Sequence, residues 1–196
     1  MTNVRSYTDE QILERVRTHA EGFVQFPKNY WMVGVQSNED ETNSFDDKFY
    51  LFRGNKCVMV LSGTTNAGKN ALEGYDKVGL TGAAVWKTIM IYYDMYSPGK
   101  HKGRMDAWRQ VKPIYYYRDS DKDGKAEQQG ELHHGIIYCN FHTNTYNKDD
   151  RSVRKLVGGW SYGCQVANEH DKYNKVMKLT FEQKRITYAL LDEWEC

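Results

Sequence analysis

The chain begins with a polar capping sequence that is followed by apolar residues at helical spacing. Thr8 stands three residues before Gln11, which is the spacing of a capping box at a helix N-terminus. Four apolar residues then recur on one face of the expected helix: Ile12, Leu13, Val16 and Ala20. The pattern predicts a helix that ends near Gly22, within an N-terminal segment 1–25 that packs on the rest of the chain.

Beyond this helix the apolar pattern is mostly that of strands. Predicted strands cover residues 31–35, 49–53, 57–61, 83–86, 88–93, 112–118 and 176–179. We expect a turn at 97–99, one or two helical turns within 100–110, and a terminal helix over 181–191. The predicted fold class is mostly β with a few helices (α+β). Since no low-complexity linker divides the chain, a single domain over 1–196 is expected.

The stretch 134–166 carries the candidate chemistry. Its apolar run over 136–141 predicts a buried strand that ends at His142, and a polar loop follows. The chain then enters a Gly-flanked turn, 161–164, whose last residue is Cys164. A thiol becomes a useful nucleophile when a nearby base or cation stabilises the thiolate. A histidine at a strand end and a cysteine on a tight turn meet that need, because the backbone holds both.

His142, a variable loop, and then Ser161-x-Gly163-Cys164 resemble the catalytic motif of the L,D-transpeptidase (YkuD-like) family. The resemblance covers about 134–166 and is nearer to the divergent phage and prophage cell-wall enzymes than to the housekeeping bacterial ones. It implies an L,D-transpeptidase-like β-sandwich or barrel with peripheral helices. It also implies cysteine-dependent acyl transfer on peptidoglycan stem peptides, as a peptidase (endolysin) or as a transpeptidase.

The same resemblance implies a role for each residue of the motif. Cys164 would be the nucleophile, His142 the general base, and Ser161 a residue that shapes the turn. Backbone N–H groups near Gly163 and Cys164 would form an oxyanion hole. The side chains expected to bind substrate are Trp160, Tyr162 and Gln165. The family usually has His before the Gly-Cys pair, and an apolar residue and then Arg after it; those three places hold Tyr162, Gln165 and Val166 here.

Other interpretations of these residues are open. A cysteine in a Gly-rich turn is more often a small buried residue than a nucleophile, and a strand-end histidine is more often structural. His133 and His134 are rival bases, although they should lie at the far end of the strand from His142. His101 could approach the site, but an exposed loop residue is the expected structure. The alternative function is a non-catalytic phage structural or cell-wall-binding protein that keeps the fold.

Two further motifs resemble ligand sites. Residues 63–70 match GxxxxGK, but Asn70 replaces the hydroxyl residue that holds magnesium in a P-loop. We expect a mobile loop there, near a substrate groove, with nucleotide binding as a weaker alternative. Asp119, Asp121 and Asp123 begin like a calcium loop, but Gly130 occupies the twelfth position, where a bidentate Glu is needed. A polar hairpin loop is the expected structure of that segment.

Charge and composition narrow the classes of partner. The 196 residues include 27 basic and 26 acidic side chains, so the net charge of +1 gives no reason to expect nucleic acid or an anionic membrane. No apolar stretch is long enough for a membrane span. The four cysteines lack metal-finger spacing, so we expect no metal and no cofactor.

The beginning of the chain has no apolar core of signal-peptide length. We therefore expect a protein made in the cytoplasm that acts at the cell wall, as a phage lysin or a virion component. A mature secreted form whose leader has been removed is the alternative.

Overall fold

The computed structural model describes residues 4–38, 42–74 and 82–195. In this part of the chain, strands dominate and the helices are few and short, which confirms the predicted fold class of mostly β with a few helices. The helices are α1 (Asp9–His19), α2 (Lys69–Gly74) and α3 (His170–Thr180). The strands are β1 (Tyr30–Gln36), β2 (Asp47–Arg53), β3 (Lys56–Thr64), β4 (Ala83–Trp86), β5 (Met90–His101), β6 (Met105–Gln110), β7 (Ile114–Asp119), β8 (His133–Gly135), β9 (Phe141–Thr143), β10 (Gln165–Ala167) and β11 (Ile186–Asp192).

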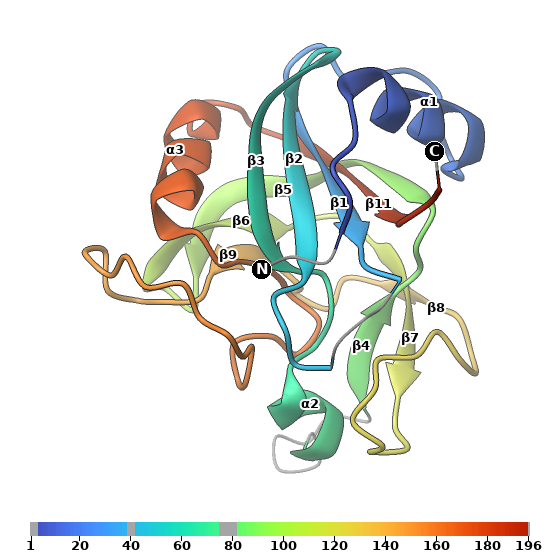
Figure 1. The fold of residues 1–196 in the computed structure, drawn as a ribbon, viewed down its shortest axis with the longest axis vertical. Helices are drawn as coiled ribbons and strands as arrows, with labels where there is room; N and C mark the ends of the chain where they lie inside the picture. Colours follow the sequence, from blue (N-terminus) through green and yellow to red (C-terminus); the bar gives the residue numbers. More distant parts are fainter. Residues whose placement is uncertain (1–3, 39–41, 75–81, 196) are drawn as a thin grey trace.

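Eight of the strands close into a barrel in the order β1-β11-β5-β6-β9-β10-β3-β2. Most neighbours are antiparallel, but β1 pairs with β11 and β9 pairs with β10 in parallel. The other three strands form a separate sheet in the order β4-β7-β8. Figure 1 shows this small sheet and α2 at one end of the molecule and α1 at the other. A closed barrel has no edge strands, so it avoids the unpaired backbone N–H and C=O groups that an open sheet has at its edges.

The capping box at the N-terminus forms as the sequence predicts. The Thr8 hydroxyl accepts a hydrogen bond from the backbone N–H of Gln11, and the Gln11 side chain accepts one from the backbone N–H of Thr8. Ile12 and Val16 are fully buried and join a cluster that includes Trp31 of β1. Helix α1 is thus held to the barrel by its apolar face.

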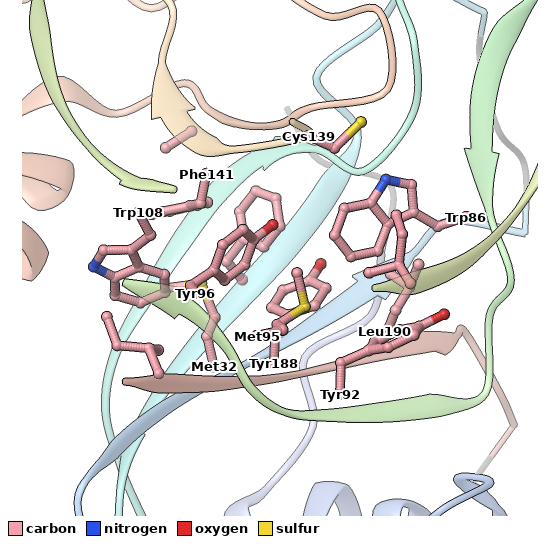
Figure 2. Close-up of a cluster of buried hydrophobic side chains, with 14 of the residues drawn as sticks. Met32, Trp86, Tyr92, Met95, Tyr96, Trp108, Cys139, Phe141, Tyr188 and Leu190 are labelled. Carbon is pink, nitrogen blue, oxygen red and sulfur yellow. The ribbon is translucent and has the colours of Figure 1, made fainter. Parts of the chain in front are cut away.

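The barrel interior is filled largely by aromatic side chains, which Figure 2 shows together with Cys139 at one edge of the cluster. Trp86 of β4 enters this core from the small sheet and packs edge-on against Tyr92 and Tyr188. Its indole N–H donates to the carbonyl oxygen of Gly163 at 2.7 Å. Trp86 therefore links the small sheet, the barrel core and the turn before Cys164.

We predict that Trp86→Ala lowers the free energy of unfolding by about 3–5 kcal/mol, because it opens a large cavity in the core. It also leaves the Gly163 carbonyl without its indole donor. Urea denaturation followed by far-UV circular dichroism measures the change. Phe181→Ala is the control, since the Phe181 side chain is 77% exposed and should contribute within about 0.5 kcal/mol. Equal losses for both variants would contradict the assigned role of Trp86.

Several sequence predictions are wrong for the middle of the chain. No turn forms at 97–99, because β5 continues to His101. The helical turns expected within 100–110 are instead the end of β5, a tight turn and strand β6. Nor do residues 136–140 form a buried strand: they lie outside the strands, and Tyr138 is 70% exposed with a positive φ of 59°.

The last two elements are exchanged relative to the prediction. Residues 176–179 belong to helix α3, and strand β11 occupies most of the range 181–191 that was expected to be helical. The segment 63–70 is also more ordered than the expected loop. It is the end of β3 followed by buried residues and the first turn of α2. The loop 119–132 does connect two antiparallel strands, β7 and β8, as the expected hairpin does.

Candidate active site

The turn that carries Cys164 is fixed by its own hydrogen bonds. The Ser161 hydroxyl donates to the carbonyl oxygen of Cys164 at 2.8 Å and accepts from the backbone N–H of Gly163 at 3.1 Å. Gly163 has φ of +124°, and a Cβ built there would lie 2.7 Å from the side chain of Ala84. Only glycine fits this position, both sterically and by its backbone conformation. Ser161 is thus placed as a residue that shapes the turn.

His142 lies in the middle of β9 and is fully buried. Its Nδ1 donates to the carbonyl oxygen of Thr143 at 2.7 Å, since a carbonyl can only accept. The proton of neutral His142 is therefore on Nδ1, and Nε2 offers a lone pair. Nε2 is buried and makes no hydrogen bond to any residue that the structure describes. The parallel pairing of β9 with β10 sets His142 opposite Val166, two residues after Cys164.

The fold brings Cys164 and His142 together with His101, which lies at the end of β5. The Cys164 sulfur and one ring nitrogen each from His142 and His101 lie within 4.8 Å of one another. The two imidazoles are stacked with their centroids 4.1 Å apart. Cys164 is half-buried, and its Sγ also accepts a hydrogen bond from the backbone N–H of Asn140 at 3.4 Å. The cysteine and histidine of the sequence motif thus meet in space.

His101 belongs to this site, so the prediction of an exposed loop histidine is wrong. It is buried at the end of β5. Asn140 Oδ1 accepts from the backbone N–H of Gln110, so its Nδ2 is the group that donates to Nδ1 of His101 at 3.1 Å. Burial, and after it the interaction with His142, lowers the pKa of His101 to about 4. His101 is therefore neutral at pH 7, with its proton on Nε2.

The environment of the two adjacent cysteines drives their pKa values apart. A hydrogen bond from the Cys139 side chain holds the pKa of Cys164 well below its usual value, and His142 and the Asn140 N–H act in the same direction against burial. The pKa of Cys139 is raised well above its usual value, by that hydrogen bond and by its own burial. Cys164 is thus the member of the pair that loses its proton first.

We predict that iodoacetamide labels Cys164 at neutral pH while Cys57 stays unlabelled until the pH is much higher. The pKa of Cys164 is lowered, whereas burial raises the pKa of half-buried Cys57, so the thiolate of Cys164 forms at a lower pH than that of Cys57. The measurement is the rate of alkylation at each cysteine from pH 5 to 10, by peptide mass spectrometry. Cys139→Ala should shift the Cys164 profile to higher pH, and an unshifted profile would contradict the assigned hydrogen bond.

Cys164 opens into a pocket of about 540 Å³. The pocket is lined by Asn70, Ala84, His101, Lys102, Arg118, Ile137, Tyr138, Cys139, Gly159, Trp160, Tyr162 and Cys164. Trp160 and Tyr162, predicted to bind substrate, both line it, as does Asn70 from the GxxxxGK segment. Gln165 does not: it is fully buried, donates to the Thr65 carbonyl and accepts from the Tyr188 hydroxyl. The expectation that Gln165 binds substrate is therefore wrong, because β10 turns its side chain into the barrel.

The oxyanion hole expected from the sequence is only partly present. The Gly163 N–H is already bound to the Ser161 hydroxyl and is not free to bind a substrate oxygen. The Cys164 N–H, in contrast, donates to no residue in the described part of the chain. Cys164 therefore offers both the sulfur and a backbone donor beside it, which is the pairing that acyl transfer requires.

The rival histidines lie in the small sheet and not in the site. His133 stacks on Tyr116 with ring centroids 5.3 Å apart, and His134 stacks on Tyr115 at 4.3 Å. Both pairs join β8 to β7. Neither histidine lines the pocket of Cys164.

Among the residues that the structure describes, two groups of side chains have donors close enough to hold a metal ion. The first is the site itself, where thiolate and imidazole donors are of the kind that zinc prefers. Nδ1 of His101 is occupied by Asn140, so ligation through its Nε2 requires a change of tautomer. The second is a set of carboxylates in the loop between β7 and β8: Asp121, Asp123 and Glu127. Two of these three, Asp121 and Asp123, are exposed, as in a solvated loop.

Comparison of this chain with models of known protein families, with curated proteins and with solved structures found no match. In the described part of the chain, no helix is both long and apolar enough to cross a membrane.

Proposed function

We propose that this protein is a cysteine-dependent acyl-transfer enzyme that acts on peptidoglycan stem peptides. The observation that carries the proposal is the arrangement of Cys164 and His142. A half-buried thiol of lowered pKa opens into a pocket, and a fully buried imidazole with a free Nε2 lies beside it. A structural cysteine needs neither a lowered pKa nor an aligned base, so this arrangement favours catalysis.

The proposed reaction begins when the Cys164 sulfur attacks the carbonyl carbon of an amide bond. Nε2 of His142 takes the thiol proton, while the Thr143 carbonyl holds the imidazole in the required tautomer. The backbone N–H of Cys164 stabilises the oxyanion. The proton then passes from His142 to the departing amine, and a thioester forms on Cys164. Water releases the product in a peptidase, and a second amine releases it in a transpeptidase.

The substrate class is proposed on the resemblance of the motif at 142–164 to that of the L,D-transpeptidases. The lining of the pocket supports a peptide ligand, because Trp160, Tyr162 and Tyr138 provide apolar contact area around Cys164. We further propose that the protein acts at the cell wall, in the manner of a phage lysin.

Digestion of purified muropeptides tests the proposal. The protein is incubated with disaccharide stem peptides, with and without an added amine acceptor, and the products are separated and weighed by mass spectrometry. Products of hydrolysis or of exchange with the acceptor are expected from the wild-type protein and not from Cys164→Ala. Tight binding of muropeptides without any product would instead support the non-catalytic wall-binding alternative.

A further inference from the structure

The pocket beside Cys164 is positively charged. Its lining includes two cationic side chains, Lys102 and Arg118, and no carboxylate. His101 adds no charge, since its pKa is lowered to about 4, mainly by burial. The whole chain carries a net charge of only +1, so two cations that share a pocket lining with no carboxylate are a local feature. Within the described part of the chain, neither cation forms an ion pair with a carboxylate.

Arg118 is held in place by contacts that leave most of its donors unused. It lies on β7 and is half-buried. One guanidinium nitrogen, Nη1, donates to the Gly82 carbonyl at 3.0 Å, and the guanidinium lies 5.0 Å from the centre of the Tyr116 ring. A guanidinium has five N–H donors. Arg118 is therefore oriented by neutral partners and retains donors for a ligand.

The small sheet connects Arg118 directly to the turn that carries Cys164. Arg118 pairs across the sheet with Ala84 of β4. The N–H of Ala84 donates to the Tyr162 carbonyl at 3.3 Å, and a Cβ built on Gly163 would lie 2.7 Å from the Ala84 side chain. Arg118 also acts electrostatically on the Cys139 thiol. Its charge is thus at the wall of the pocket that Cys139 and Cys164 also line.

We propose that Arg118 is a specificity residue that binds a free carboxylate of the substrate close to the amide bond attacked by Cys164. A guanidinium is planar and matches a carboxylate with two parallel hydrogen bonds, so it fixes orientation as well as charge. Lys102, which is exposed on the turn between β5 and β6, adds to the positive potential without such a fork. The inference rests on the proposed function, because it names the class of peptide that the same site accepts.

The test uses two synthetic peptides that differ in one group, a free carboxylate or the matching carboxamide next to the scissile amide. For the wild-type protein, kcat/KM is expected to be about 10- to 100-fold higher for the carboxylate peptide. Arg118→Gln should remove most of this preference by slowing only the carboxylate peptide. Arg118→Lys should retain part of it, since it keeps the charge and loses the fork. Lys102→Gln should change the preference by less than Arg118→Gln.

The outcomes separate this inference from the proposed function. Turnover of both peptides at equal rates by the wild-type protein would overturn the role of Arg118 and leave the acyl-transfer proposal intact. Turnover of neither peptide, with no adduct on Cys164, would overturn both. Circular dichroism and thermal melts show whether Arg118→Gln folds. If it does not, the preference of Arg118→Lys decides, and a value equal to that of the wild type would contradict two-point binding by the guanidinium.

Discussion

Replacing Cys164 with Ala is expected to lower kcat/KM for muropeptides by about 10³- to 10⁵-fold, because no other group beside His142 can form the thioester. The neighbouring thiol of Cys139 cannot substitute. In the variant the hydrogen bond to Cys164 is gone, but burial still raises the pKa of Cys139, and its side chain is only 4% exposed. The assay is release of product from purified stem peptides under single-turnover and steady-state conditions.

The control for this loss is Cys57→Ala. Cys57 is also a half-buried free cysteine, but it lies on β3 and its pKa is raised by burial. We expect Cys57→Ala to retain the full wild-type rate. A Cys164→Ala variant that folds and keeps more than about a tenth of the activity would mean that this thiol is not the nucleophile.

The second large effect is expected at His142. His142→Gln should lower kcat/KM by about 10²- to 10⁴-fold, which is the usual contribution of a positioned general base. Glutamine occupies a similar volume in this fully buried position but cannot take a proton from the Cys164 thiol. The loss should be largest at low pH, where the thiol is protonated, and smaller at high pH, where the thiolate forms without a base. The pH profile of kcat/KM measures this difference.

The matched control for His142 is His134→Gln. His134 is exposed on the small sheet and stacks on Tyr115, away from the pocket lining. We expect the activity of this variant to equal that of the wild type at every pH. A uniform loss for His142→Gln across the pH range, accompanied by a lower melting temperature, would indicate that His142 serves packing and not proton transfer.

The elements that the sequence predicts correctly are those whose structure is set locally. Helix α1 is specified by the Thr8 and Gln11 capping box and by two residues on its apolar face. The hairpin of β2 and β3 is specified by its two apolar runs and by Gly54, whose φ is +56° in the turn between them. In both cases, residues close in sequence provide the contacts that decide the structure.

The errors arise where the barrel sets the structure. Strand β11 lies between β1 and β5, and its first six residues are all buried, so it lacks the alternation that identifies a half-exposed strand. A continuous apolar run of this kind does not distinguish strand from helix. In α3, by contrast, the buried residues Tyr173, Val176 and Thr180 do follow a helical period. This helical spacing is visible in the sequence, so the predicted strand over 176–179 is wrong for a reason that the sequence itself contains.

For a similar reason, the sequence predicts only some of the residues of the site. Cys164 and His142 belong to a local motif, but His101 reaches them through the β5–β6 hairpin, where Met105 and Ala107 are buried on alternate positions. Pro98 and Gly99 predict a turn at 97–99, and such a turn would leave His101 in an exposed loop. Arg118 likewise enters the pocket from the small sheet, and its place depends on the pairing of β7 with β4.

The most direct test of the nucleophile assignment is to trap the acyl-enzyme. The protein is mixed with a stem peptide and quenched in acid within the first turnover, and the intact mass and the tryptic peptides are measured. We predict a mass increase equal to the acyl group, located on the peptide that contains Cys164 and removed by hydroxylamine as a thioester would be. An acyl group on any other residue, or product formation by a Cys164→Ala variant at the wild-type rate, would contradict the account.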